Sequence, residues 1–325
     1  MALTKTKKRK RRPDQFQSKA YSTKRIARED FSIEQLNAFK ELLSFDKEIF
    51  ESYKKEKDSL LIGFDEVGRG SIAGPVGTGA YTCSTFYVEP DELIQEIKLA
   101  RQVISDQLLT TNDRNSYYAE TLCNDLSIAD DLNQLSALSA LLNLEDSKKV
   151  SKAKREKLTE ALRQVPCLDS NSHLLYSTQF ESAKTIDKIG IVESIWTSMT
   201  KNLINIIDQY DLVNGFLPKE IVLLVDGPKM IKGLEDKIKV LKQEYLDIDF
   251  IQVAIKKGDT KSSVIAAGAN LAKLARDKHM TEISLDYNDY GWTTNAGYGT
   301  RRHYEAIEKY GICKEHRKSY LSEIL

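Results

Sequence analysis

Apolar runs of strand length alternate with segments of helical periodicity along most of this chain. Two runs are strong: Leu60–Ile62, which leads into two acids, and Glu220–Asp226, which reads EIVLLVD with five apolar residues before an acid. Weaker strand patterns occupy Thr78–Thr82, His173–Phe180 and Ile248–Ile255. Short continuous apolar runs are typical of buried strands, whereas apolar residues three and four positions apart are typical of one face of a helix.

The clearest helical pattern covers Ile186–Tyr210, where isoleucine, methionine and leucine recur on one face. The other segments with helical patterns are Ser32–Lys54, Ser151–Val165, Ile231–Glu244, Ser263 to about Ile283 and Ala306–Tyr310. Strands that alternate with helices predict an α/β domain. The first two strands are close enough to form a hairpin, so we expect a mixed β-sheet flanked by helices, with a C-terminal helical region.

The domain organisation follows from shifts in composition. Residues 1–12 carry seven basic side chains and no acid, and we expect residues 1–30 to form a disordered basic tail that binds phosphate backbones loosely or acts as a nuclear-import signal. Residues 31–59 predict an N-terminal helical extension, and residues 60–325 the main domain. Within it, about 88–144 is rich in Leu, Asp, Asn and Ser and predicts a helical insertion.

Composition excludes some classes of protein. The chain has 325 residues, 41% hydrophobic and 30% charged, as in water-soluble globular proteins. No apolar stretch approaches the roughly 20 residues that span a bilayer, and the basic start is not followed by an apolar segment, so we expect neither a membrane protein nor a secretory signal. The four cysteines are far apart and predict free thiols in the reducing cytoplasm. We expect a cytoplasmic monomer.

Four acids are candidates for a shared site. Asp65 and Glu66 follow the first strong run, Asp226 ends the second, and Asp259 stands where a loop enters a helix. Each acid alone also fits an ordinary turn or helix cap. Gathered at one edge of the sheet, they would repel one another unless divalent cations neutralised them. All-oxygen ligation favours Mg²⁺ or Mn²⁺ over Zn²⁺, and two such ions about 3.5–4 Å apart are a common device for phosphodiester hydrolysis.

Several glycine-rich and acidic motifs resemble, in order, those of the ribonuclease HII family. They are DEVGRG at residues 65–70 with AGPV at 73–76, DSKKVS at 146–151, VDG at 225–227, KGDTKS at 257–262, and GYGT at 297–300 followed by His303 and by HRKS at 316–319. The resemblance covers about residues 60–320, interrupted by the insertion. It implies a ribonuclease H-like fold and a catalytic domain over residues 60–325. It also implies an endonuclease that cuts RNA in RNA–DNA hybrids and nicks duplex DNA at embedded ribonucleotides, leaving 5′-phosphate and 3′-hydroxyl ends.

The resemblance also implies roles for individual residues. The family's metal-binding and catalytic acids fall on Asp65, Glu66, Asp226 and Asp259. Elements that sense the ribose 2′-hydroxyl and the next deoxyribose fall on Gly68, Arg69, Gly70 and Tyr298. The expected phosphate contacts are Arg69, Lys148, Lys149 and Lys261, while His303 and His316 are expected to be structural. The chain departs from the family pattern in the long insertion, in residues 185–191 and in residues 267–270.

Three alternatives remain open. The sister family, ribonuclease HIII, carries a separate N-terminal substrate-binding domain, for which residues 1–59 are short and basic. A nucleic-acid-binding module without catalysis would leave substrate intact in Mg²⁺ or Mn²⁺. A carboxylate-metal exonuclease would be stopped by blocked ends.

Overall fold

A mixed five-stranded sheet forms the centre of the computed structural model, which describes residues 33–56, 58–84, 89–91, 94–95, 144, 152–163 and 174–322. The strands lie in the order β3-β2-β1-β4-β5. Their bounds are β1 Ser59–Val67, β2 Val76–Cys83, β3 Leu174–Glu181, β4 Glu220–Asp226 and β5 Asp249–Ile255. β1, β2 and β3 are antiparallel neighbours, whereas β4 and β5 run parallel to β1. The predicted mixed sheet and its first hairpin are confirmed.

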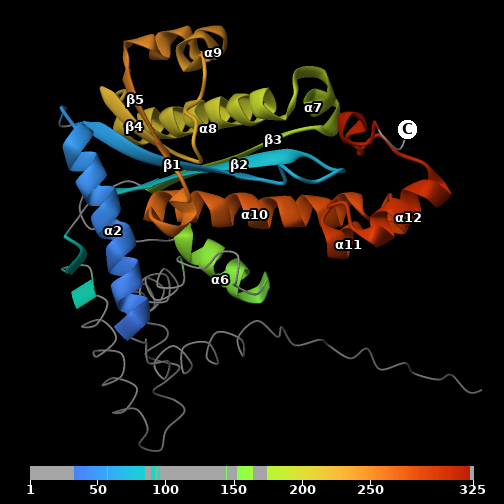
Figure 1. The fold of residues 1–325 in the computed structure, drawn as a ribbon. Coiled ribbons are helices and arrows are strands. Elements are labelled where there is room, and N and C mark those ends of the chain that lie inside the picture. Colours follow the sequence, from blue (N-terminus) through green and yellow to red (C-terminus); the bar gives the residue numbers. More distant parts are fainter. Residues whose placement is uncertain are drawn as a thin grey trace, which may run out of the picture.

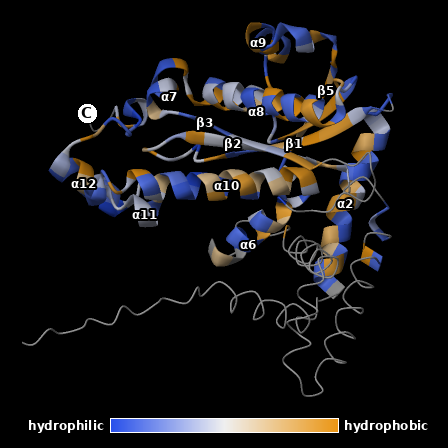
Figure 2. Cartoon of the chain, turned by 180° about the vertical axis from the view of Figure 1, so that it is seen from behind, coloured by the Kyte–Doolittle hydropathy of each residue, from blue (hydrophilic) through white to orange (hydrophobic). Residues whose placement is uncertain are grey.

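Helices cover both faces of this sheet (Figure 1). The long helix α8, Ile191–Asn214, lies on one face, and α10, Ser263–Ile283, lies on the other. Against α10 pack α2, Ile33–Tyr53, and α6, Lys152–Leu162. The shorter α9, Leu234–Leu241, packs beside α8. In Figure 2, orange marks much of β1, β2 is mostly pale, and α8 and α10 carry both colours.

Alternation along the strands creates two separate cores. Leu60, Ile62 and Phe64 of β1 belong to the cluster that includes residues of α8, whereas Leu61 belongs to the cluster that includes residues of α10, α2 and α6. Because successive side chains of a strand point to opposite faces, this pattern assigns a face to every later residue of β1.

Glycines allow α10 to lie directly on the sheet. A Cβ added to Gly63 would lie 2.4 Å from the Ile265 nitrogen, and one added to Gly79 would lie 2.1 Å from the Gly268 carbonyl oxygen. Helix backbone and strand backbone therefore touch, and this contact fixes the N-terminal half of α10 relative to β1 and β2.

The C-terminal region forms a third apolar cluster. It contains α11, Trp292–Asn295, and α12, Arg301–Tyr310, with the 3₁₀ turns η5, Asn288–Tyr290, and η6, Lys318–Tyr320. Its buried side chains include Trp292, Met280 and Leu321, which pack with Ile72 and Ala73 from the loop after β1. The end of the chain thus packs against the loop that carries the glycine-rich motif.

Two predicted helices are wrong in their extent. The pattern over 186–210 is divided between α7, Ala183–Ile189, and α8, because Gly190 adopts φ 80° and ends the first helix. The segment 231–244 becomes helical only at Leu234, since Gly233 is left-handed at φ 66°, and it ends in the 3₁₀ turn η3, Gln243–Asp247. Apolar periodicity continues across both glycines, so the pattern alone does not predict where these helices end and begin.

Some predictions lie outside the described residues. These are the basic tail 1–30, nearly all of the insertion 88–144, and Lys148 and Lys149. None of the helices in the described parts of the chain combines the length and the apolar character required to cross a bilayer.

Candidate active site

The sheet places Asp65 and Asp226 side by side. Phe64 pairs with Val225 in the parallel register of β1 and β4, and each acid is the next residue of its strand. Phe64 and Val225 both pack toward α8. Their successors therefore point to the opposite face, toward α10. Two carboxylates thus share one face at the carboxyl ends of adjacent parallel strands, where open α/β sheets bind ligands.

The turn that begins α10 adds Asp259 to this pair. Asp259 lies in the 3₁₀ turn η4, Gly258–Thr260, and only 6% of it is exposed. The Gly258 N–H donates a hydrogen bond of 2.6 Å to Asp226 Oδ1, which ties the turn to the end of β4. Lys257, just before it, holds a left-handed conformation at φ 57°. Backbone strain of this kind persists where the surrounding structure imposes it, and it is concentrated at functional sites.

The electrostatics of Asp65 show that the acids act on one another. Burial raises the pKa of Asp65 well above its ordinary value, and the charges of Asp226, Glu66 and Asp259 raise it further. The Glu66 N–H opposes this shift by donating a 2.7 Å hydrogen bond to Asp65 Oδ1. An excess of negative charge therefore surrounds this carboxyl group.

Glu66 lies on the other face of β1. The pleat that turns Asp65 toward α10 turns Glu66 toward the α8 side, and its Oε1 accepts a hydrogen bond of 2.9 Å from Arg69 Nη1. Its antiparallel partner is Thr78 on β2. The structure thus brings Asp65, Asp226 and Asp259 to one face and holds Glu66 at the same strand end by an ion pair.

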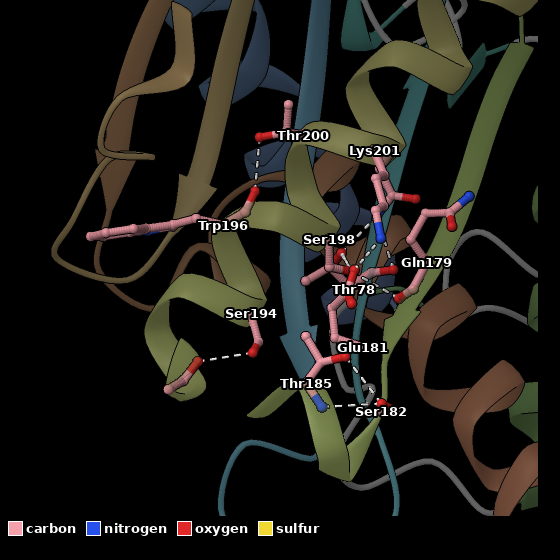
Figure 3. Close-up of polar contacts among 12 residues, drawn as sticks. Thr78, Gln179, Glu181, Ser182, Thr185, Ser194, Trp196, Ser198, Thr200 and Lys201 are labelled. Carbon is pink, nitrogen blue, oxygen red and sulfur yellow. Dashed lines mark hydrogen bonds and ion pairs between the residues drawn. The ribbon is translucent and has the colours of Figure 1, made fainter. Parts of the chain in front are cut away.

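A buried polar network fixes β2 beneath Glu66 (Figure 3). The Thr78 and Ser198 hydroxyls are 2.7 Å apart, and Ser198 Oγ donates to the Gln179 carbonyl oxygen. Asn202 Nδ2 also donates to Thr78 Oγ1. Hydrogen-bonded polar groups inside an apolar layer favour one register over its neighbours, since a slip would leave them unpaired. No pattern in the sequence marks these residues as a network.

The donor set fits a hard divalent cation, although the side chains do not enclose one as they stand. Within the described ranges, no three acid, histidine or cysteine side chains are arranged so that they could hold a metal ion. The carboxylates are oxygen donors, which suit Mg²⁺ or Mn²⁺. The raised pKa of Asp65, caused by burial and its acidic neighbours, marks a place where added positive charge would be stabilising.

The glycine-rich turn and Tyr298 lie next to each other beside the acids. Ser71 forms a β-bridge with Tyr298, and the Ile72 N–H donates 2.9 Å to the Gly297 carbonyl oxygen. Gly68 has φ 78°, and a Cβ there would lie 2.1 Å from Arg276 Nε. Tyr298 is 42% exposed, so its ring is available to a ligand.

The remaining predicted residues divide into three groups. Arg69, Gly70 and Lys261 are exposed, as ligand contacts must be. His303 and His316 are buried, and His303 Nδ1 lies 2.9 Å from the Tyr298 carbonyl oxygen, so both histidines occupy structural positions. Lys148 and Lys149 lie outside the residues described.

Two buried arginines beside the turn were missed from the sequence. Arg276 Nε donates to the Pro75 carbonyl oxygen at 2.9 Å, and Arg317 Nε donates to the Gly74 carbonyl oxygen at 3.0 Å. An arginine within the alanine-rich segment of α10 was the available signal for Arg276, because charged residues are rarely buried without a specific partner.

Comparison with known proteins supports the assignment to a family. The family model described as Ribonuclease HII matches residues 131–322, which begins after Glu66 and includes Asp226 and Asp259. A ribonuclease HII of Shouchella clausii is 37% identical over 180 residues, 55% of this chain, and the chain spans only 57% of that relative's length. A ribonuclease HII of Staphylococcus aureus strain Newman is 29% identical over 299 residues, 91% of this chain and 83% of the relative.

Among solved structures, the complex of PCNA with ribonuclease HII from Archaeoglobus fulgidus is similar to the chain at 19% identity and a TM-score of 0.46, covering 79% of this chain and 93% of that one. The family model covers more than half of the chain, and the acids and the glycine-rich turn meet at one sheet edge within a mixed, helix-flanked sheet. This chain therefore belongs to the ribonuclease HII family and has its ribonuclease H-like α/β fold.

Proposed function

We propose that this protein is a metal-dependent endonuclease that hydrolyses the RNA strand of RNA–DNA hybrids and incises duplex DNA at embedded ribonucleotides. The observation that carries the proposal is the meeting of Asp65, Asp226 and Asp259 on one face of the sheet, in a chain of this family. The products are a 5′-phosphate and a 3′-hydroxyl. Residues 60–325 form the catalytic domain, and residues 31–59 are an extension packed on it.

Asp65, Glu66, Asp226 and Asp259 would hold Mg²⁺ or Mn²⁺. When bound, a pair of such ions supplies Lewis acidity and a water molecule that deprotonates near neutral pH. The protein's own contribution is to bring the carboxylates together from two strands and a turn. The hydrogen bond from the Gly258 N–H orients Asp226, and the ion pair with Arg69 keeps Glu66 at the same strand end.

Recognition of RNA would rest on the turn formed by Gly68, Arg69 and Gly70 and on Tyr298. The 2′-hydroxyl distinguishes RNA from DNA, and it both donates and accepts hydrogen bonds. Backbone groups of a glycine-rich turn can approach it closely because no Cβ intervenes. The exposed ring of Tyr298, joined to this turn through the bridge with Ser71, would pack against the neighbouring deoxyribose. Arg69 and Lys261 would contact phosphates.

The experiment that tests this proposal uses an end-blocked, labelled duplex that carries one ribonucleotide. In Mg²⁺ or Mn²⁺ the protein should cut once beside the ribonucleotide and leave the matching all-DNA duplex intact. Asp65→Asn should bind the duplex and leave it uncut.

Each contrary result has its own meaning. If the wild-type protein leaves both this duplex and an RNA–DNA hybrid uncut, a binding module is favoured. Cutting that requires a free end would favour an exonuclease. An active Asp65→Asn protein would refute the role of the acids. A cut within RNA–DNA hybrids but not at the single ribonucleotide would favour ribonuclease HIII-like activity.

A further inference from the structure

The carbonyl oxygen of Arg69, in the middle of the glycine-rich turn, accepts two hydrogen bonds from the C-terminal end of the chain. Arg317 Nη1 donates at 3.0 Å and the Tyr320 hydroxyl donates at 3.0 Å. The donors stand more than 240 residues further along the chain, as the sequence separations of 248 and 251 show. We call His316–Tyr320 the C-terminal clamp.

Arg317 attaches the C-terminal clamp to the whole loop after β1. The backbone N–H of Arg317 donates to the Ile72 carbonyl oxygen at 2.9 Å, and its side-chain Nε donates to the Gly74 carbonyl oxygen at 3.0 Å. The side chain is fully buried. Burying a guanidinium is costly unless it is hydrogen-bonded, so the carbonyl groups of Gly74 and Arg69, which accept from Nε and Nη1, hold the guanidinium in one place and are themselves held by it.

Asp187 of α7 holds the clamp from the other side. Its carboxylate accepts hydrogen bonds from the Lys318 N–H at 3.0 Å, from the Ser319 N–H at 2.9 Å and from the Ser319 hydroxyl at 2.6 Å. Although burial opposes the shift, the hydrogen bonds from Ser319 and Lys318 lower the pKa of Asp187 below its ordinary value. The carboxylate is thus charged and bonded at neutral pH.

The glycine-rich turn alone does not fix the position of the Arg69 carbonyl group. Gly68 and Gly70 have no side chains to restrict them, and glycine has more conformational freedom than any other residue. Within the turn the Ser71 N–H donates to the Gly68 carbonyl oxygen at 3.3 Å, a contact that does not involve the Arg69 carbonyl group. The two hydrogen bonds from the C-terminal clamp restrain the Arg69 carbonyl group, and Asp187 keeps the donors in place.

We propose that Asp187, Arg317 and Tyr320 are positioning residues for ribonucleotide recognition. They fix the Arg69 carbonyl group, and with it the backbone that reads the 2′-hydroxyl. This inference rests on the proposed function and deepens it: selectivity for the ribonucleotide depends on the far end of the chain as well as on the turn that touches the ribose.

The test compares Tyr320→Phe and Asp187→Ala with the wild-type protein. Tyr320→Phe removes one donor to Arg69 and keeps the ring, and Asp187→Ala releases the clamp from α7. Matched controls are Tyr310→Phe and Asp286→Ala, which change exposed residues of the same types outside these contacts. The readout is KM and kcat on the duplex with one ribonucleotide, together with the inhibition constant of the all-DNA duplex.

The ratio of that inhibition constant to KM measures preference for the ribonucleotide. Tyr320→Phe, which loses one hydrogen bond to the Arg69 carbonyl oxygen, should lower this ratio about twofold to tenfold through KM. Asp187→Ala, which loses the three hydrogen bonds that hold the clamp on α7, should lower the ratio in the same direction. The inhibition constant for DNA should stay unchanged because the phosphate contacts remain. The controls should match the wild type in this ratio and in their unfolding temperature.

Either of two results would overturn the inference. One is an unchanged preference in Tyr320→Phe, which decides the question even if Asp187→Ala is poorly folded. The other is a loss confined to kcat, which would show that the clamp serves catalysis or stability instead of recognition. A wild-type protein that shows no preference for the ribonucleotide would refute the proposed function itself, and the two failures are thereby distinguished.

Discussion

Asp46 makes the stability of this protein depend on pH in a direction opposite to that of most acids. It lies on α2, fully buried, and its Oδ2 accepts hydrogen bonds from the Ser263 hydroxyl and, at 3.1 Å, from the Val264 N–H at the start of α10. Burial raises its pKa to about 6, against the opposing effect of hydrogen bonds from Ser262, Ser263 and Val264. The charged form is therefore disfavoured in the folded state.

The size and sign of the effect follow from this shift. The pKa rises from 3.8 to about 6. At about 1.36 kcal/mol per pKa unit, folding destabilises the charged form by about 3 kcal/mol relative to the neutral form. Since the folded pKa exceeds the unfolded one, the stabilising contribution is complete below the unfolded pKa and is lost as pH rises through about 6.

Asp46→Asn isolates this contribution because an amide stays neutral at every pH. The free energy of unfolding of the variant minus that of the wild type should increase by about 3 kcal/mol between about pH 4 and pH 7, and then level off. Urea denaturation followed by circular dichroism, at intervals of one pH unit, measures the difference. Asp286→Asn, at an exposed position, is the control and should give a flat difference. A flat difference for Asp46→Asn as well would refute the argument.

The remaining predictions concern packing and a buried histidine pair. Gly79→Ala should lower the free energy of unfolding by about 1–3 kcal/mol or more, because the new Cβ would lie 2.1 Å from the Gly268 carbonyl oxygen; an unchanged urea midpoint would contradict this contact. Burial and the neighbouring His303 lower the pKa of His316 to about 4. The contribution of the neutral His316 to folding stability is therefore complete above the ordinary histidine pKa and is lost as pH falls toward 4. Histidine ring signals in NMR should show this titration, and a midpoint near the ordinary value would place His316 in solvent.

Much of the fold could be predicted because the apolar patterns and the residues at the ends of the elements indicated the same strands and helices. Glu220–Asp226 is β4 as expected, and α10 begins at Ser263 after a serine cap, as its sequence indicates. The meeting of Asp65 and Asp226 follows from the rule that parallel strands end at one sheet edge. Their register then placed both on the α10 face.

The features that could not be predicted from the sequence depend on contacts between distant segments. Asp46 on α2 bonds to the start of α10, and Arg317 bonds to the turn after β1, at sequence separations of 218 and 248. No spacing or periodicity marks such pairs. Gly190 interrupts a continuous apolar pattern through its φ of 80°, and an isolated glycine in a helical pattern is usually tolerated. The pleat of β1 places Glu66 on the face opposite Asp65, at the same strand end, where its charge still acts on Asp65.

Calorimetric titration with Mn²⁺ tests most directly whether the acids at the ends of β1 and β4 and in η4 form a cation site. Wild-type protein should bind Mn²⁺, Asp226→Asn should bind it at least about tenfold more weakly, a change of about 1.4 kcal/mol, and Asp249→Asn should bind like the wild type. Asp249 lies at the opposite end of the sheet, at the start of β5. Equal Mn²⁺ affinity in Asp226→Asn and the wild type would contradict the account.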